Sequence, residues 1–258
     1  MRALLGRAGG LLVGVVRATA AVMVLIVGTV VVILVSPLPI RVRGISLAAW
    51  VTTFVCRLAP PLFGIRIEIS PDTRAAIRVH RGLLFANHYS YFDILALQAI
   101  WPLRYLSAKE NEKLPLIGTV ARSIGTVFVD RSDRESRTAA RDAVADSPKF
   151  PALVIFPEGG LGPGHELRPF RYGAFEIAVE DSLLVLPIVI RYADREAVRW
   201  GEEGLHVALW RMMRRTAPTS VRLEHLETLQ CGAGDDAEAL AVDMHRNLSA
   251  RLGLDPVQ

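Results

Sequence analysis

The sequence predicts an α/β fold in which helices cover a sheet on both faces, preceded by a helical segment embedded in a membrane. Two observations support this prediction. An uncharged apolar run of 19 residues occupies positions 18–36, and this length is enough to span a bilayer as one helix. Beyond residue 65, short apolar runs alternate with charged stretches of helical periodicity. That alternation is typical of an α/β protein with buried strands.

Seven short apolar runs are the expected strands of the sheet. They lie at residues 65–69, 82–86, 104–108, 126–130, 152–156, 185–192 and 221–227. Helical patterns at 132–146 and 170–180 lie between several of them. A last helix is expected from a cap at Asp235 or Asp236 to a stop at Gly253. Three of its apolar positions recur at helical spacing and should face the core: Leu240, Met244 and Leu248.

The first 64 residues are interpreted as a membrane anchor, and residues 65–258 as one catalytic domain. A second apolar segment, 45–65, follows the first. Arginines flank both ends of the first segment, so positive charge gives no orientation for a single crossing. A re-entrant hairpin and two full crossings would both return the domain to the side where it began. A buried core helix and a cleaved signal peptide are the alternatives, but SPLPIRVR offers no small-residue cleavage site.

The charge balance and the cysteines argue against several classes of protein. The chain has 30 basic and 26 acidic residues, a net charge of +4 and a pI of about 9.4. It has no block of Lys/Arg interleaved with aromatic residues, which argues against nucleic-acid binding. Cys56 and Cys231 follow no metal-ligand or disulfide spacing. We therefore expect two buried thiols and no metal site.

His88 and Asp93 are the first candidates for catalysis, and they follow the expected strand at 82–86. Residues five apart point about 140° apart on a continuous helix. The two side chains can therefore meet only if His88 lies in a strand-to-helix turn and Asp93 in the first turns of the helix. Asn87 and Ser90 suit such a turn or cap. The pair would give a base oriented by a carboxylate, although a structural turn histidine has the same spacing.

Further segments occur in a fixed order after this pair. They are YLSAKENEKLPLIG (105–118), GTVFVDR (125–131), ALVIFPEGGLGPG (152–164) and VLPIVI (185–190). Together with NHYSYFD (87–93) they resemble the motif blocks of the glycerolipid acyltransferase family, whose best-known members are the 1-acylglycerol-3-phosphate acyltransferases. The resemblance covers roughly residues 65–230. It implies a mixed central sheet flanked by helices, similar to glycerol-3-phosphate acyltransferase, and transfer of a fatty acyl group to a lipid hydroxyl.

The resemblance also implies roles for individual residues. His88 would be the general base that deprotonates the acceptor hydroxyl, and Asp93 would be its orienting partner. Arg131 would bind the acceptor phosphate, for which its guanidinium offers a bidentate fork. The expected substrate-binding residues are Asn87, Lys109, Arg131, Glu158, Gly159 and Pro187. Taken singly, Arg131, Lys109 and Glu158 are each structural more often than functional, but their expected position at neighbouring strand ends favours a site.

Two positions depart from the family pattern. Gly160 and Leu161 stand where phosphatidate-forming members have Thr-Arg, so one expected phosphate partner is missing. Compensation by Arg168 and Arg171 is an alternative to the commoner role of such residues as surface or helix-end charges. The residues after the fourth block are more similar to the lysophosphatidylcholine and lysophosphatidylethanolamine branch.

The sequence thus predicts a membrane-bound O-acyltransferase with acyl-CoA or acyl-carrier protein as thioester donor and no cofactor. The expected acceptor is 1-acylglycerol-3-phosphate, which would give phosphatidate. Lysophosphatidylethanolamine, lysophosphatidylcholine and lyso-ornithine lipid are alternative acceptors. A Gly-x-Ser-x-Gly elbow is absent from the sequence, which favours direct attack without an acyl-enzyme.

The expected location is the inner (plasma) membrane, with the catalytic domain facing the cytoplasm. Membrane lipids and the acyl donor are the expected partners, acyl-carrier protein among them, and no nucleic acid. A lipid-binding protein without catalysis is the alternative from another class. The changes at Gly160 and Leu161 motivate it, and the intact His88–Asp93 pair argues against it. The run GGLGPG lacks the Lys-Ser/Thr ending of a P-loop.

Overall fold

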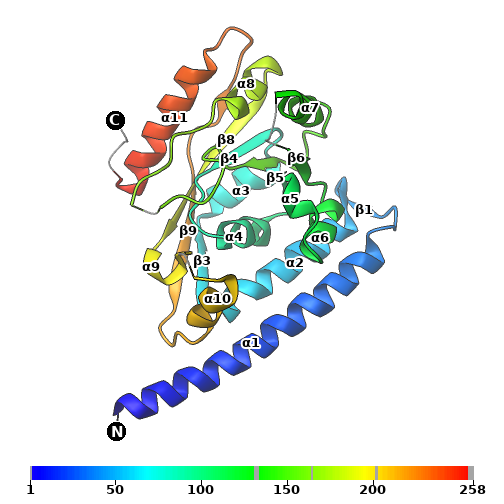
Figure 1. Cartoon of the computed structure of the whole chain (residues 1–258). Helices are drawn as coiled ribbons and strands as arrows, with labels where there is room; N and C mark the ends of the chain where they lie inside the picture. The colour runs from blue at the N-terminus through cyan, green and yellow to red at the C-terminus, as the bar shows by residue number, and fades with distance from the viewer. Residues whose placement is uncertain (1, 131–133, 164, 201–202, 255–258) are drawn as a thin grey trace.

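The computed structural model describes residues 2–130, 134–163, 165–200 and 203–254. Within these residues a mixed sheet forms the centre of the domain (Figure 1), in the strand order β3–β9–β8–β4–β7–β5–β6 with β10 pairing on β8. The strands are β3 (Ile65–Ile69), β4 (Leu83–Ala86), β5 (Arg104–Ala108), β6 (Val127–Val129), β7 (Leu153–Ile155), β8 (Leu184–Tyr192), β9 (Thr219–His225) and β10 (Leu229–Gln230). All seven predicted strands are present.

The strands from β8 to β6 run parallel to one another. β9 joins β8 in the antiparallel direction, and β3 runs parallel to β9. The sheet is therefore mixed, and this prediction is confirmed. The carboxyl ends of β8, β4, β7, β5 and β6 meet at one edge, where α/β proteins collect ligand-binding residues.

Helices cover both faces of the sheet, as predicted (Figure 1). They are α3 (Pro71–Val79), α4 (Phe92–Ile100), α5 (Lys109–Glu112), α6 (Ile117–Ser123), α7 (Arg134–Ala145), α8 (Gly173–Glu180), α9 (Arg195–Val198), α10 (Leu205–Met213) and α11 (Ala237–Leu252). α3 and α4 contribute to the hydrophobic core on one face, and α8 and α11 to the core on the other.

Side chains of β4 alternate between these two cores. Leu84 and Ala86 belong to the core under α4, while Leu83 and Phe85 belong to the core under α8 and α11. Phe85 packs edge-to-face on Phe175 of α8, with 4.9 Å between the ring centroids. Because β4 is buried on both faces, its end is held firmly and the residues after it emerge at the carboxyl edge of the sheet.

The last helix begins and ends where the sequence predicts. The Asp236 side chain accepts hydrogen bonds from two backbone N–H groups of the first turn of α11, and the helix ends at Gly253 with a φ of 67°. Glycine adopts this left-handed conformation without a steric cost. Met244 and Leu248 are buried in the core, and Leu240 packs against it.

The N-terminal segment consists of α1 (Arg2–Val35), a short hairpin of β1 (Arg41–Val42) and β2 (Ile45–Ser46), and α2 (Leu47–Leu62). By length and composition, the stretch Gly9–Val35 of α1 could cross a membrane, with a mean hydropathy of 2.9. α1 begins well before the predicted run of residues 18–36 and ends within it, at Val35. Its Arg17 guanidinium donates to the carbonyl oxygens of Met213 and Arg215, at 3.3 and 2.6 Å, at the end of α10. This contact ties α1 to the domain that contains the sheet.

α2 lies between α1 and α4 (Figure 1). Arg57 Nε donates to the carbonyl oxygen of Ala99, at the end of α4, at 2.7 Å. At 16 residues α2 is shorter than a membrane span. The division at residue 64 and the topology of the two apolar segments stay predictions. Cys56, on α2, and Cys231 are buried and unpaired, as the sequence predicts.

Gly28 sets the spacing between α1 and α2. A Cβ atom at Gly28 would lie 2.7 and 2.9 Å from the two γ carbons of Val55, whereas at Gly9 it would meet no atom within 4 Å. Alanine raises helix propensity at either position by about 1 kcal/mol. At Gly28 this gain is opposed by an overpacking cost of about 1–3 kcal/mol, because the valine side chain is stiff.

We therefore expect Gly28→Ala to melt at a lower temperature than Gly9→Ala, with both variants purified in the same detergent. Gly9→Ala is the matched control, since it makes the same change in the same helix without a neighbour. Equal melting temperatures would contradict a close approach of the two helices at Gly28.

Candidate active site

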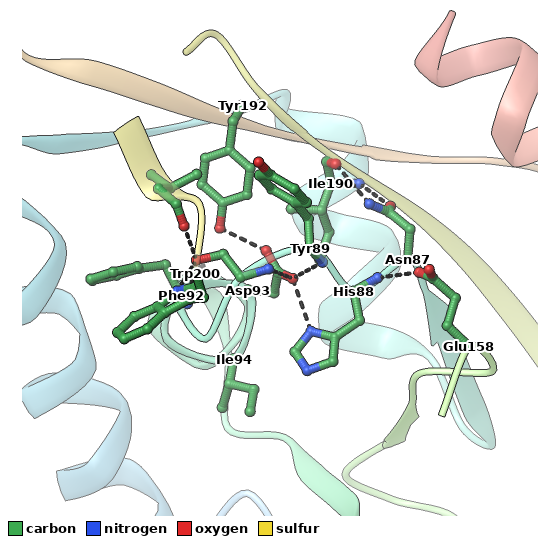
Figure 2. A network of polar contacts seen from close by, with 12 residues as sticks. Asn87, His88, Tyr89, Phe92, Asp93, Ile94, Glu158, Ile190, Tyr192 and Trp200 are labelled. Atoms are coloured by element: carbon green, nitrogen blue, oxygen red, sulfur yellow. Dashed lines mark hydrogen bonds and ion pairs between the residues drawn. The ribbon is translucent and has the colours of Figure 1, made fainter. Parts of the chain in front are cut away.

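His88 lies in the turn between β4 and α4, and Asp93 lies in the first turn of α4, as their spacing requires. His88 Nδ1 and Asp93 Oδ2 are 2.9 Å apart. The Asp93 side chain is fully buried, and that of His88 is 11% exposed. A carboxylate only accepts hydrogen bonds, so Nδ1 carries the ring proton and Nε2 has the free lone pair. Figure 2 shows Nε2 pointing away from Asp93, which makes it the atom able to take a proton.

In the described part of the chain, four hydrogen bonds hold the Asp93 carboxylate. Besides the His88 ring, Oδ2 accepts the backbone N–H groups of Tyr89 and Ser90 at 2.7 and 2.9 Å. Oδ1 accepts the hydroxyl of Tyr192 at 2.6 Å (Figure 2). A buried carboxylate without partners would be costly, and these donors satisfy it. Asp93 therefore fixes both the imidazole ring and the turn that carries it.

Two side chains from outside the motif support this turn. Tyr192 ends β8, and burial and the neighbouring Asp93 raise the pKa of its phenol well above the usual value, so it stays a hydrogen-bond donor. Trp200 Nε1 donates to Ser90 Oγ at 2.9 Å, and Ser90 Oγ donates to the carbonyl oxygen of Val198 at 3.0 Å. The end of β8 and the segment after α9 thus hold the turn from the side opposite the imidazole (Figure 2).

Glu158 is a second buried carboxylate and lies on the backbone of His88. Its Oε1 accepts the N–H of His88 at 2.6 Å, and its Oε2 accepts the N–H of Arg168 at 3.1 Å. The N–H of Gly162 donates to the carbonyl oxygen of His88 at 2.7 Å. Burial raises the pKa of Glu158 to about 7, although the two backbone hydrogen bonds act to lower it. Both carboxylate oxygens are engaged with the backbone, and the expected contact with substrate stays a prediction.

Asn87 extends the pairing of β4 with β8. Its Nδ2 donates to the carbonyl oxygen of Ile190 at 3.0 Å, and its Oδ1 accepts the N–H of the same residue at 2.7 Å. Pro187 is buried within β8, opposite Phe85. Gly159, with a φ of 72°, makes the turn after β7. Asn87 and Pro187 thus belong to the sheet that supports the site, and their roles in substrate binding stay predictions.

A cavity of about 810 Å³ lies at the ends of β5, β6 and β7. Phe156 lines this cavity and stacks on the His88 ring, with 4.0 Å between the ring centroids. The basic side chains of Arg141 and Arg171 also line it. Arg141 forms an ion pair with Glu176 on α8. The volume is in the range of ligand sites, and the stacked ring of Phe156 brings the cavity next to His88.

The two predicted basic site residues are Lys109 and Arg131, and no described contact joins Lys109 to His88. Lys109 begins α5, and its Nζ lies 2.5 Å from Glu112 Oε2, with half of its side chain exposed. Arg131 lies outside the residues that the structure describes. Of the predicted site residues, the structure brings together His88, Asp93, Glu158 and Asn87. Among the described residues, no three His, Cys, Asp or Glu side chains are grouped so that they could hold a metal.

Three aromatic residues at the site were missed by sequence reasoning: Phe156, Tyr192 and Trp200. Tyr192 is 99 residues from Asp93 in the chain, so no local spacing connects them. The sequence does hold a signal for two of them. Phe156 and Tyr192 each end an expected strand at the sheet edge that carries His88.

Comparison with known proteins identifies the family. The family model for acyltransferases matches residues 68–191. A lyso-ornithine lipid O-acyltransferase of Pseudomonas aeruginosa is 31% identical over 205 residues, which is 78% of this chain and 75% of that protein. The chain belongs to the acyltransferase family. This acyltransferase is also 27% identical, over 174 residues, to a 1-acyl-sn-glycerol-3-phosphate acyltransferase of Neisseria meningitidis, covering 65% of this chain and 68% of the relative.

The crystal structure of the 1-acyl-sn-glycerophosphate acyltransferase from Thermotoga maritima has the same fold. It superposes with a TM-score of 0.71 over 96% of each chain, at 18% sequence identity. The superposition therefore includes the N-terminal helices of this acyltransferase as well as its sheet. The predicted enzyme class and the predicted fold class are both confirmed.

Tyr192→Phe should lower kcat about tenfold, since a hydrogen bond to a charged group contributes about 1.5–3 kcal/mol. Without this donor, the Asp93 carboxylate and the imidazole ring that it orients are held less firmly. Steady-state acyl transfer at one fixed pH checks the change in kcat. Tyr105→Phe is the matched control, because the Tyr105 hydroxyl donates to the carbonyl oxygen of Ile94 at 3.2 Å, away from Asp93. Equal kcat values for the two variants would exclude this role for Tyr192.

Glu158 should make the stability of the protein depend on pH. Its raised pKa of about 7 means that the folded protein keeps a proton that the unfolded chain releases near 4.5. The free energy of unfolding should therefore fall as pH rises from about 4.5 to about 7, by at most about 1.4 kcal/mol per pH unit. Glutamine is neutral throughout, so Glu158→Gln should lack this fall. Melting temperatures from pH 5 to 8 should shift in favour of the variant as pH rises, and parallel curves would contradict the prediction.

Proposed function

We propose that the protein transfers a fatty acyl group from a thioester donor to the free hydroxyl of a lysolipid, with His88 as general base and Asp93 as its orienting partner. The observation that carries the proposal is the geometry of the His88 ring. Its Nδ1 is fixed by a fully buried carboxylate at 2.9 Å. Its Nε2 forms no hydrogen bond within the described residues and lies beside the stacked Phe156 that lines the cavity.

This geometry suits direct attack by the acceptor. An alcohol is a weak nucleophile at neutral pH, so His88 Nε2 takes the hydroxyl proton as the oxygen attacks the thioester carbonyl carbon. The new carbon–oxygen bond forms, the carbon–sulfur bond breaks, and the proton passes from Nε2 to the departing thiolate. Asp93 stabilises the imidazolium between the two transfers. The thioester donor, acyl-CoA or acyl-carrier protein, is the only co-substrate in this scheme.

The first acceptor we propose is 1-acylglycerol-3-phosphate, which would give phosphatidate. It appears in the names of the Neisseria meningitidis relative and of the Thermotoga maritima structure. Lyso-ornithine lipid is the second acceptor. The Pseudomonas aeruginosa relative that carries this name matches more of the chain, and Gly160 and Leu161 lack the hydroxyl and guanidinium expected for a phosphate.

We also propose that α1 attaches the enzyme to the inner (plasma) membrane, with the catalytic domain on the cytoplasmic side. The composition of α1 and the nature of the proposed acceptors support attachment to a membrane. The stretch Gly9–Val35 has the length and composition of a membrane span, and only 17% of its most apolar window is buried inside the molecule. The proposed acceptors are lipids, so a domain held at the bilayer surface would meet them where they reside.

His88→Ala should lower kcat by about 10²–10⁴-fold, the usual contribution of a general base. Vesicle binding should stay unchanged, and the variant should still unfold cooperatively, at a lower temperature because the buried Asp93 carboxylate loses one donor. Thiol release by the purified protein is the measurement, with acyl-CoA and acyl-carrier protein as donors. The acceptor panel is lysophosphatidate, lysophosphatidylethanolamine and lyso-ornithine lipid. His206→Ala, at an exposed position on α10, is the matched control.

Full activity of His88→Ala would reject the proposed base. Lipid binding by the wild-type protein without transfer to any acceptor would favour the non-catalytic lipid-binding alternative.

A further inference from the structure

Two arginines lie over the glycines of the turn after β7. A Cβ atom at Gly159 would lie 2.4 Å from Nε of Arg171, and one at Gly160 would lie 3.5 Å from a terminal nitrogen of Arg168. Both guanidinium groups therefore lie against the Pro-Glu-Gly turn and approach it from a later part of the chain. The turn ends at Leu161, the position at which the sequence lacks the arginine of the family pattern.

The loop that carries these arginines is fixed to the turn by its backbone. The N–H of Arg171 donates to the carbonyl oxygen of Pro157 at 2.9 Å. The N–H of Arg168 donates to the buried carboxylate of Glu158 at 3.1 Å. Since Glu158 also holds the backbone of His88, the same side chain positions the catalytic turn and the arginine loop.

The charges around the cavity distinguish Arg171 from the other basic residues near it. Arg141 also lines the cavity, but it forms ion pairs with Glu176 and Glu180 on α8. The guanidinium of Arg171 forms no ion pair or hydrogen bond within the residues that the structure describes. A guanidinium beside a cavity and free of a carboxylate can bind an anionic group through two parallel hydrogen bonds. Phe156, which also lines this cavity, stacks on His88.

We propose that Arg171, with Arg168 beside it, binds the anionic head group of the acceptor and takes the place of the arginine that is absent at position 161. This inference rests on the proposed function, because the head group must lie in the cavity while the acceptor hydroxyl reaches His88. Both proposed acceptors carry a suitable group. It is a phosphate in lysophosphatidate and a carboxylate in lyso-ornithine lipid.

The test is a comparison of Arg171→Gln, Arg168→Gln and the double variant with the wild type in mixed micelles. The KM for an anionic acceptor should rise about tenfold to a hundredfold, while kcat and the KM for the donor stay near wild type. Monoacylglycerol, which has a free hydroxyl but no charge, should be acylated equally well by all four proteins. The acceptor whose KM rises more, lysophosphatidate or lyso-ornithine lipid, carries the anionic group that the site binds.

Arginine placed at the family position should rescue the defect. We expect Leu161→Arg in the Arg171→Gln background to restore the KM for the anionic acceptor. Arg246→Gln is the matched control, because Arg246 is exposed on α11 and pairs with Asp243, away from the cavity. A double variant with an unchanged acceptor KM would overturn the inference. Equal losses with monoacylglycerol and with the anionic acceptors would overturn it as well.

A binding measurement separates this inference from the proposed reaction. The detergent-solubilised His88→Ala protein should bind lysophosphatidate or lyso-ornithine lipid in a titration, and binding should weaken when Arg168 and Arg171 are also replaced. Weaker binding without turnover by the wild type would reject the catalytic proposal and keep the head-group site. Turnover by the wild type with unchanged binding in the arginine variants would support the catalytic proposal and reject the head-group site.

Discussion

The buried carboxylate of Asp93 is the interaction on which the active site depends. Its donors come from the ring of His88, from the backbone of the turn and from Tyr192 at the end of β8. Removal of one donor from a buried polar group typically costs about 1–3 kcal/mol, and more when the group is charged. The orientation of the His88 ring is therefore part of the stability of the fold.

Two buried carboxylates contact different parts of His88. Asp93 accepts from the imidazole ring and leaves its Nε2 free to act as the proposed base. Among the described residues, Glu158 accepts hydrogen bonds from backbone N–H groups, which hold the strand-end turn and the arginine loop in place. Their surroundings explain the difference. Asp93 is matched by several donors, while burial outweighs two hydrogen bonds at Glu158 and raises its pKa to about 7. A carboxylate thus orients the imidazole ring in one position and holds the backbone in the other.

The sequence predicts what is local and periodic in this molecule. The strands are recognisable because each is a short, mostly apolar run, and the last helix because Asp236 and Gly253 mark its ends. The His88–Asp93 pair is predictable because its five-residue spacing allows only one arrangement, a turn followed by a helix.

Contacts between distant segments could not be predicted in this way. Asn87 looks like a cap residue in the sequence, but its amide group pairs with the backbone of Ile190, 103 residues away. The loop that returns Arg168 and Arg171 to the turn after β7 is likewise a property of the tertiary fold. The packing of α2 on α4 is not visible in hydropathy either, because a membrane-facing helix and a half-buried one have similar composition.

The pairing of Asn87 with Ile190 shows that the geometry around His88 depends on the register of β8 against β4. Tyr192 is two residues beyond Ile190 on the same strand, so one alignment of β8 against β4 sets both the amide pairing and the hydroxyl on Asp93. A slip of one residue would turn every side chain of β8 to the opposite face of the sheet. Such long-range pairings are slow to form because of their loop-closure entropy. The ordered arrangement of His88, Asp93 and Tyr192 therefore depends on this one register.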